Sequence, residues 1–174
     1  SKVEDVIREI RELIKRLEKH VKDSVREVRK HIEDNKRKVE KLVKEVEDVI
    51  RELRKEDGDE RVEEKVERLK RRIDEMLKDL EENLRRVKRE VREDNRRLKK
   101  LIEDVKKKIT DVERDGLMRE LAEELRRRLD EVLEKATRLH RELEKRHDDV
   151  LREAEKRLRD LKREIDKVLD DLRR

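Results

Sequence analysis

Apolar residues recur along the chain at positions that share one face of an α-helix. In the first third of the chain, the apolar set repeats itself at offsets of 18 and 36 residues. At about 100° per residue, this set covers a single stripe roughly 120° wide. The pattern predicts a helix with one buried face and is not that of a disordered polyelectrolyte. The positions are Val3, Val6, Ile7, Ile10, Leu13, Ile14, Leu17, Val21, Val25, Val28, Ile32, Val39, Leu42, Val43, Val46, Val49, Ile50 and Leu53.

The same period continues through the rest of the chain. Val62, Leu80 and Leu98 are 18 residues apart, and the last third repeats at the same interval from Leu125. Eighteen residues make five turns of an α-helix, so the stripe does not drift around the axis. We therefore expect three nearly straight helices that close around one core, rather than a left-handed supercoil.

Capping residues mark the expected helix ends. Ser1 followed by Glu4 has the pattern of a capping box at the start of the first helix. Gly58 is placed to end that helix in a left-handed conformation, and Asp59 to cap the next helix. Gly116 repeats this arrangement at the second turn.

The helices expected from these ends are of nearly equal length. They cover about residues 2–56, 59–113 and 117–173. Because the connections are short, consecutive helices should run antiparallel. The expected fold is therefore all-α: an antiparallel up-down-up bundle of three long, nearly straight helices that forms a single domain over residues 1–174.

The composition excludes several kinds of functional site and segment. Asp, Glu, Lys and Arg make up 61% of the chain, against about a quarter in an average domain, and Phe, Trp, Tyr, Pro and Cys are absent. Without cysteine there is no disulfide, thiolate nucleophile or cysteine metal site. No apolar run exceeds two residues, so neither a membrane span nor a secretory segment is expected.

Positive charge is in slight excess but is not concentrated. The 56 basic and 51 acidic residues give a net charge of +5, and the two signs alternate along the chain. No basic run is longer than three residues, as at 106–108 and 126–128, and no aromatic side chain could stack on a base. We expect a solvated surface of mixed ion pairs, with no nucleic acid and no membrane as partner.

The whole chain resembles computationally designed helical bundles of the parametric, idealised kind. The features that carry this likeness are the 18-residue repeat, the Glu, Lys and Arg surface, the two glycine turns and the lack of aromatics and proline. Ser1 and Lys2, without an initiator methionine, would suit a tag-cleavage scar. The resemblance implies a protein with no natural biochemical function or localisation, expressed as a soluble recombinant product in the cytoplasm.

Seven polar residues interrupt the apolar stripe in the middle repeats. His31, for example, takes the position that Leu13 and Val49 hold one repeat to either side. Folding the chain at its turns places residue n of the first helix level with about 115 − n of the second. Residue m of the second helix then lies level with about 231 − m of the third. The seven residues are Ser24, His31, Asn35, Asn83, Asn95, His140 and His147.

These registers collect the polar residues into two layers. The first layer is expected to hold His31, Asn83 and His147, with Asn35 one turn away. The second is expected to hold His20, Asp94, Asn95 and Thr137, with Ser24 and His140 about one turn further on. The facing edges predict that the three helices follow one another clockwise, seen from the N-terminal end of the first.

We interpret the layers as buried hydrogen-bond networks that specify register and helix order. A buried amide or imidazole without a partner costs about 1–3 kcal/mol, whereas repeated Leu, Ile and Val would tolerate slips. No metal site is expected, because His31, His147 and an amide lack the further ligand that zinc requires. A pH switch is an alternative, since protonating a buried imidazole places charge in the core.

No enzyme activity and no cofactor are expected from this sequence. It shows no nucleophile–base pair and no Gly-rich loop, and a packed bundle offers no cleft. Two function classes remain: a structural scaffold that needs no partner, and an interaction module that self-associates or accepts a partner helix. The stripe favours a closed monomer over a homo-oligomer, because apolar positions outside it, such as Leu117, are scattered.

An idealised bundle of this kind should resist heat. With helix-favouring residues throughout and a long aliphatic core, we expect the helical circular dichroism signal to persist beyond about 90 °C. A cooperative melt near about 60 °C would contradict this expectation. Added salt should change the result little, because an exposed ion pair contributes about 0–1 kcal/mol.

Overall fold

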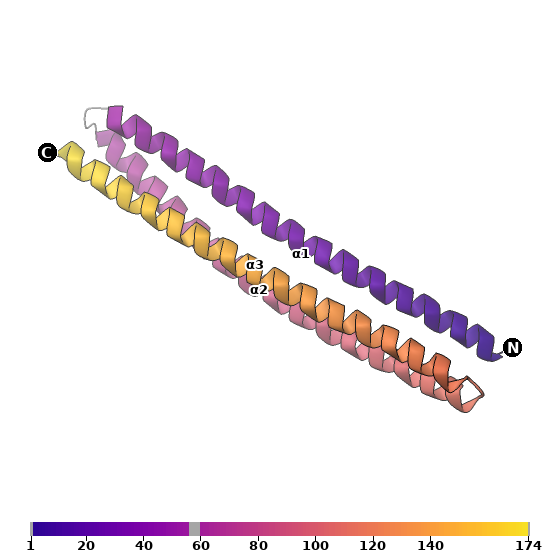
Figure 1. The fold of residues 1–174 in the computed structure, drawn as a ribbon. Helices are drawn as coiled ribbons and strands as arrows, with labels where there is room; N and C mark the ends of the chain where they lie inside the picture. Colours follow the sequence, from indigo (N-terminus) through magenta and orange to yellow (C-terminus); the bar gives the residue numbers. More distant parts are fainter. Residues whose placement is uncertain (1, 56–59, 174) are drawn as a thin grey trace. The chain divides into compact units, whose positions relative to one another are not determined.

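The computed structural model describes residues 2–55 and 60–173, which form three helices (Figure 1). The helices are α1 (Lys2–Lys55), α2 (Glu60–Arg114) and α3 (Arg119–Arg173), and the described residues contain no strand. The prediction of an all-α bundle of three long helices is confirmed. The capping roles expected of Ser1, Gly58 and Asp59 lie outside the described residues.

Local sequence explains why these segments are helical. They are rich in Glu, Lys, Arg and Leu, which favour the helix, and contain no proline or glycine in their interiors. Glu4 and Asp5 lie in the first turn of α1, and Arg54 and Lys55 in its last turn. These charges complement the partial charges at the helix ends, and the apolar stripe supplies the packing that long helices need.

The helices pack into two compact units, which are described separately. Unit 1 is formed by the chain up to Arg29 together with Val87–Glu144. Unit 2 is formed by Lys30–Arg86 together with the chain from Lys145 onward. Each helix therefore contributes one segment to each unit.

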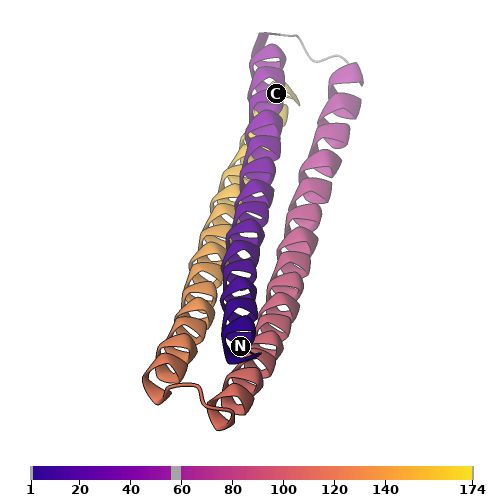
Figure 2. The ribbon, with the colours of Figure 1, turned by 90° about the vertical axis from the view of Figure 1, so that its right-hand side faces the viewer.

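Contacts between side chains set the order of the helices in unit 1. On one edge of α1, Glu9 accepts a hydrogen bond from Lys108 of α2 at 3.1 Å, and His20 contacts α2 further along. On the opposite edge, Glu18 pairs with Arg128 of α3. Seen from the N-terminal end of α1, the helices follow one another clockwise, as expected (Figure 2).

Unit 2 has the same order of helices. Glu45 of α1 pairs with Arg72 of α2 at 2.6 Å, and Glu47 of α1 pairs with Arg157 of α3 at 3.2 Å. Asn35 of α1 lies against Asn83 of α2, and Glu45 against Arg72, so residue numbers rise along α1 while those of its α2 partners fall, and the two helices are antiparallel in this unit.

The register between α2 and α3 differs from the expected one. Residue m of α2 lies against about residue 236 − m of α3, as the pairs Lys106–Asp130 and Asp74–Lys162 show. This is five residues further along α3 than folding at the turn predicted. Part of the difference arises because α3 begins at Arg119 rather than at 117.

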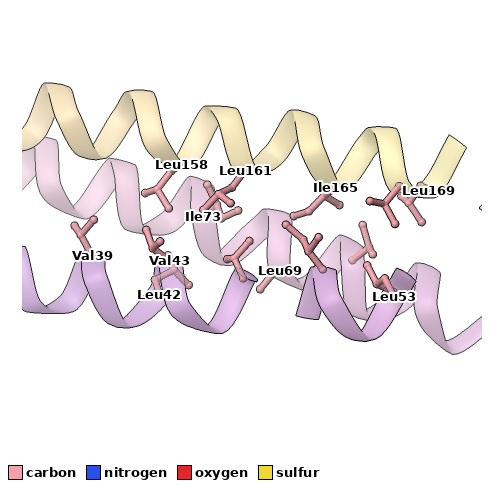
Figure 3. Packing of buried hydrophobic residues seen from close by; sticks show 14 of the residues in the cluster. Val39, Leu42, Val43, Leu53, Leu69, Ile73, Leu158, Leu161, Ile165 and Leu169 are labelled. Carbon is pink, nitrogen blue, oxygen red and sulfur yellow. The ribbon is translucent and has the colours of Figure 1, made fainter. Parts of the chain in front are cut away.

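A large aliphatic cluster forms most of the core of unit 2. Val46, Val66, Ile73 and Ile165 have no exposed surface, and Leu158 likewise has none. Burying one such side chain contributes about 1.5–3 kcal/mol. Figure 3 shows side chains from all three helices meeting there, among them Val39, Leu42, Val43, Leu53, Leu69, Ile73, Leu158, Leu161, Ile165 and Leu169.

The turn between α2 and α3 is a Schellman motif. Gly116 has φ of 115°, its N–H bonds the carbonyl of Glu113 at 3.4 Å, and the N–H of Leu117 bonds that of Val112 at 3.0 Å. Leu117 and Val112 are both buried beside the turn. Leu117, which the sequence placed among scattered apolar positions outside the stripe, is therefore part of the core, and α3 begins only after Met118.

Replacing Gly116 by alanine should destabilise the protein through the backbone alone. A side chain at φ of 115° is strained, yet a β-carbon there would meet no atom within 4 Å. We expect Gly116→Ala to lower the free energy of unfolding by about 1–2 kcal/mol. Guanidinium unfolding followed by circular dichroism measures the change. Gly116→Asn should cost less, and equal losses for both variants would contradict the backbone explanation.

Candidate functional site

The first polar cluster, here called the Asn35 cluster, lies in unit 2 and joins all three helices. Asn35 of α1 accepts a hydrogen bond from Nδ2 of Asn83 of α2, with the atoms 3.4 Å apart. Its own Nδ2 lies 3.1 Å from Nε2 of His147 of α3. Asn35 is 5% exposed and His147 2% exposed. The cluster is Asn35, Asn83 and His147.

The two hydrogen bonds between members of the Asn35 cluster can both form while all three side chains are neutral. Because the carbonyl oxygen of Asn35 accepts from Asn83, its amide nitrogen faces His147 and donates to the ring. Nε2 of His147 is then the acceptor, and the ring proton lies on Nδ1. Arg86 donates to Oδ1 of Asn83 at 3.0 Å and extends the cluster to the surface.

The second polar cluster, here called the Ser24 cluster, lies in unit 1 and is a chain of hydrogen bonds. The side chains of His20 and Ser24 contact the two carboxylate oxygens of Asp94, each at 2.8 Å. Ser24 Oγ lies 3.1 Å from Nε2 of His140, and Nδ1 of His140 lies 2.9 Å from Oδ1 of Asn95. The cluster is His20, Ser24, Asp94, Asn95 and His140.

When the rings of His20 and His140 are both neutral, one hydrogen bond of the Ser24 cluster lacks a proton. Oδ1 of Asn95 can only accept, so Nδ1 of His140 carries a proton. The single hydroxyl proton of Ser24 points to Asp94, which leaves none for Nε2 of His140. If His140 is doubly protonated, it donates to Ser24 and Asn95, and every bond in the chain is made.

Burial and charge act on this cluster in opposite directions. Burial alone would raise the pKa of Asp94, but hydrogen bonds from His20 and Ser24, and the charges of His20 and His140, outweigh it and hold that pKa below its usual value. Burial lowers the pKa of His140 below its usual value; Asp94 opposes this shift and His20 adds to it. The second proton on His140 is therefore disfavoured by burial and favoured by its hydrogen bonds.

The expectation that His31 lies in a buried layer is wrong. The structure leaves its side chain exposed, and Asn35 takes the central place beside Asn83 and His147. The physical reason is its position at the edge of the stripe. Leu13 and Val49, which hold the equivalent position one repeat away, are themselves only partly buried.

Thr137 does not join the Ser24 cluster as expected. Its hydroxyl donates to the carbonyl of Leu133, one turn back in its own helix, at 2.9 Å. Asn95, which was expected to meet Thr137, instead contacts His140. The five-residue difference in the α2–α3 register brings His140 to this level.

Arg86, which contacts Asn83 of the Asn35 cluster, was not expected from the sequence to join a polar layer. Arg86 lies three residues after Asn83, so the two side chains are neighbours on one helix face. That spacing was a usable signal. In a chain where most residues are charged, however, it does not distinguish Arg86 from many other surface arginines.

The clusters offer little for metal binding or catalysis. No group of three or more His, Cys, Asp or Glu side chains within 2–55 and 60–173 is arranged to hold a metal ion. The structure brings Ser24 to His140, two residues that the sequence placed at the same level, and this makes a hydroxyl–imidazole pair. The hydroxyl proton, however, points to Asp94 rather than to the ring, so His140 does not activate this oxygen as a nucleophile.

Comparison with known proteins supports the fold. A solved structure described as a computationally designed three-helix bundle matches 99% of this chain and 89% of its own, with a TM-score of 0.60 and 17% sequence identity. No protein-family model and no curated protein matches the sequence. Over the residues that the structure describes, no helix combines the length and apolar content needed to cross a membrane.

Lowering the pH should weaken folding through His140. Because its pKa is lower in the folded state than in the unfolded chain, stability is lost as pH falls below the ordinary histidine value of 6.5 towards the folded pKa. The contribution of Asp94 is present above its ordinary pKa of 3.8 and is lost only at lower pH, through its depressed pKa. We therefore expect a lower guanidinium midpoint at pH 5.5 than at pH 7.5.

Two variants isolate the contribution of His140. His140→Gln removes this titration and should show a smaller fall in midpoint between the two pH values. His31→Gln changes an exposed histidine with no bond in either cluster and should keep the full fall. The same pH dependence in all three proteins would contradict the assignment.

Proposed function

We propose that this chain is a designed structural scaffold with no natural biochemical function, whose two polar clusters specify the register and order of its helices. The observation that carries the proposal is Asn35, a buried side chain bonded to both α2 and α3. Ser24 has the same place in unit 1, between Asp94 of α2 and His140 of α3. Each cluster thus links three helices through one residue of α1.

The aliphatic core alone could not supply this specificity. Its Leu, Ile and Val side chains repeat along each helix, so helices shifted by a turn, or arranged in the opposite order, would still bury apolar surface. In those arrangements Asn35 would lose Asn83 or His147. Each buried polar group left without a partner costs about 1–3 kcal/mol.

The design origin is supported by features of the whole chain. The 18-residue repeat extends through all three helices, and 61% of the residues are charged. The described helices contain no proline or glycine. The likeness to a designed three-helix bundle supports the same origin at the level of the fold.

The alternative of an interaction module has less support. Among the described residues, the exposed large apolar side chains are Leu101, 49% exposed, and Met118, 68% exposed. Leu101 lies on α2 and Met118 in the turn before α3, and they offer no continuous face for a partner helix. A monomer is the state this surface favours, and light scattering after size exclusion should give a mass near 21.6 kDa.

A pH-responsive bundle is the second candidate function. It is supported by His140, a buried imidazole within bonding distance of Ser24 and Asn95. Because its protonated form can donate both bonds, acid should weaken unit 1 gradually rather than open it at one pH. An abrupt loss of structure near pH 6 that His140→Gln abolishes would favour a switch over a scaffold.

The scaffold proposal is tested by removing one partner or all three. Asn35→Leu removes the hydrogen-bond partner of Nδ2 of Asn83 and of Nε2 of His147, and should lower the free energy of unfolding by about 1–3 kcal/mol. Replacing Asn35, Asn83 and His147 together by leucine removes these polar groups and should recover most of that loss. Guanidinium unfolding measures both. A triple variant less stable than the single one would contradict the reasoning on polar satisfaction.

Crosslinking measures the helix order in the variant with all three leucine substitutions. Glu47→Cys and Arg157→Cys place two thiols, in a chain without cysteine, on the facing edges of α1 and α3. A short thiol crosslinker should join them fully in the otherwise unchanged chain. In the triple variant we expect partial crosslinking, because the opposite order turns Glu47 towards α2. Full crosslinking there would show that the Asn35 cluster does not decide helix order.

A further inference from the structure

A groove between α1 and α3 in unit 1 has no part in the scaffold role. Its volume is about 770 Å³, within the range of about 300–1,000 Å³ usual for small-molecule sites. Its walls are formed by residues 18–29 of α1 and 128–139 of α3. Over that span it extends about 16 Å along the helices. Its apolar lining is Val21, Val25, Val132 and Leu139.

Positive charge gathers on the rim of this groove. The rim holds the two carboxylates Glu18 and Glu131 and five cations. Arg128 pairs with Glu18 at 3.1 Å. Apart from this pair, the groove is lined by four cations and one carboxylate, Glu131. This excess of positive charge differs from the even mixture of charges along most of the chain. The four cations are Lys22, Arg26, Arg29 and Lys135.

We propose that this groove binds a single-chain alkyl carboxylate. The apolar lining, elongated along the helix axes, suits an extended hydrocarbon chain rather than a compact ring. The unpaired cations of the rim suit a carboxylate headgroup, which each can approach without losing an existing ion pair. Neither feature is needed to specify helix order, so the site is independent of the two polar clusters.

Unit 2 supplies an internal comparison for the role of charge. A second groove between α1 and α3, of about 540 Å³, is lined by Val168 and Leu172 together with charged residues. Those charges balance: two cations, Arg54 and Lys167, face two carboxylates. Arg54 is already paired with Glu164 at 2.8 Å. An anionic ligand should therefore select the groove of unit 1.

Monomeric decanoate is the probe, titrated into the full chain labelled with ¹³C on valine and leucine methyl groups. We expect saturable shifts at the methyl groups of Val21, Val25, Val132 and Leu139. Decyltrimethylammonium has a chain of the same length and the opposite charge, and should bind at least tenfold more weakly. Equal affinity for the two probes, or shifts spread evenly over both units, would overturn the proposal.

Charge reversal on the rim tests the site itself. Arg26→Glu combined with Lys135→Glu should weaken decanoate binding at least tenfold, since each exposed ion pair contributes up to about fivefold. Lys41→Glu combined with Arg152→Glu makes the same change in net charge in unit 2 and should leave affinity unchanged. Circular dichroism verifies that both variants are folded. Equal weakening in both would show that only net charge matters and would overturn the proposal.

Discussion

The buried amide of Asn35 needs one partner on each of the other two helices. Its carbonyl oxygen accepts from Asn83 and its amide group donates to His147. At 5% exposure, water offers little replacement for either bond. Both bonds form only when α2 and α3 lie on the correct sides of α1 and at the correct level. The aliphatic layers on either side have no such requirement, because a methyl group packs equally well against many neighbours.

The two polar clusters pair their buried hydrogen-bond donors and acceptors in different ways. In the Asn35 cluster, the amides alternate donor and acceptor groups, and the chain of bonds closes with neutral side chains. In the Ser24 cluster, one hydroxyl proton lies between two acceptors, so the full set of bonds requires a second proton on His140. That proton is opposed by burial and supported by Asp94. Stability in unit 1 is therefore linked to pH by geometry as well as by the presence of histidine.

Charge on the surface does less for the fold than its abundance suggests. The described ion pairs between helices, such as Glu18–Arg128 and Glu47–Arg157, involve side chains that remain substantially exposed. Such pairs contribute about 0–1 kcal/mol each. They accompany the helix order that the core and the polar clusters favour. Around the groove of unit 1, cations outnumber carboxylates. There the surface charge can bind a ligand, because some cations have no ion-pair partner among the described residues.

Much of the architecture follows from the sequence alone. The repeat of apolar positions determined three helices, the face that each one buries and, with the short connections, their antiparallel order. It also identified most members of both polar clusters, because a polar residue on an apolar stripe stands out. These features depend on angular position around a single helix, which the order of residues fixes.

Only the tertiary structure decided which polar residues meet. His31 and Asn35 both interrupt the stripe of α1, yet one is exposed and the other buried. The difference depends on how closely neighbouring helices cover the edge of the stripe. The turn buried Leu117 and shifted the register of α3, which replaced Thr137 by His140 as the partner of Asn95. Bonds of about 3 Å are decided by distances between helices, and residue spacing within one helix carries no information about those distances.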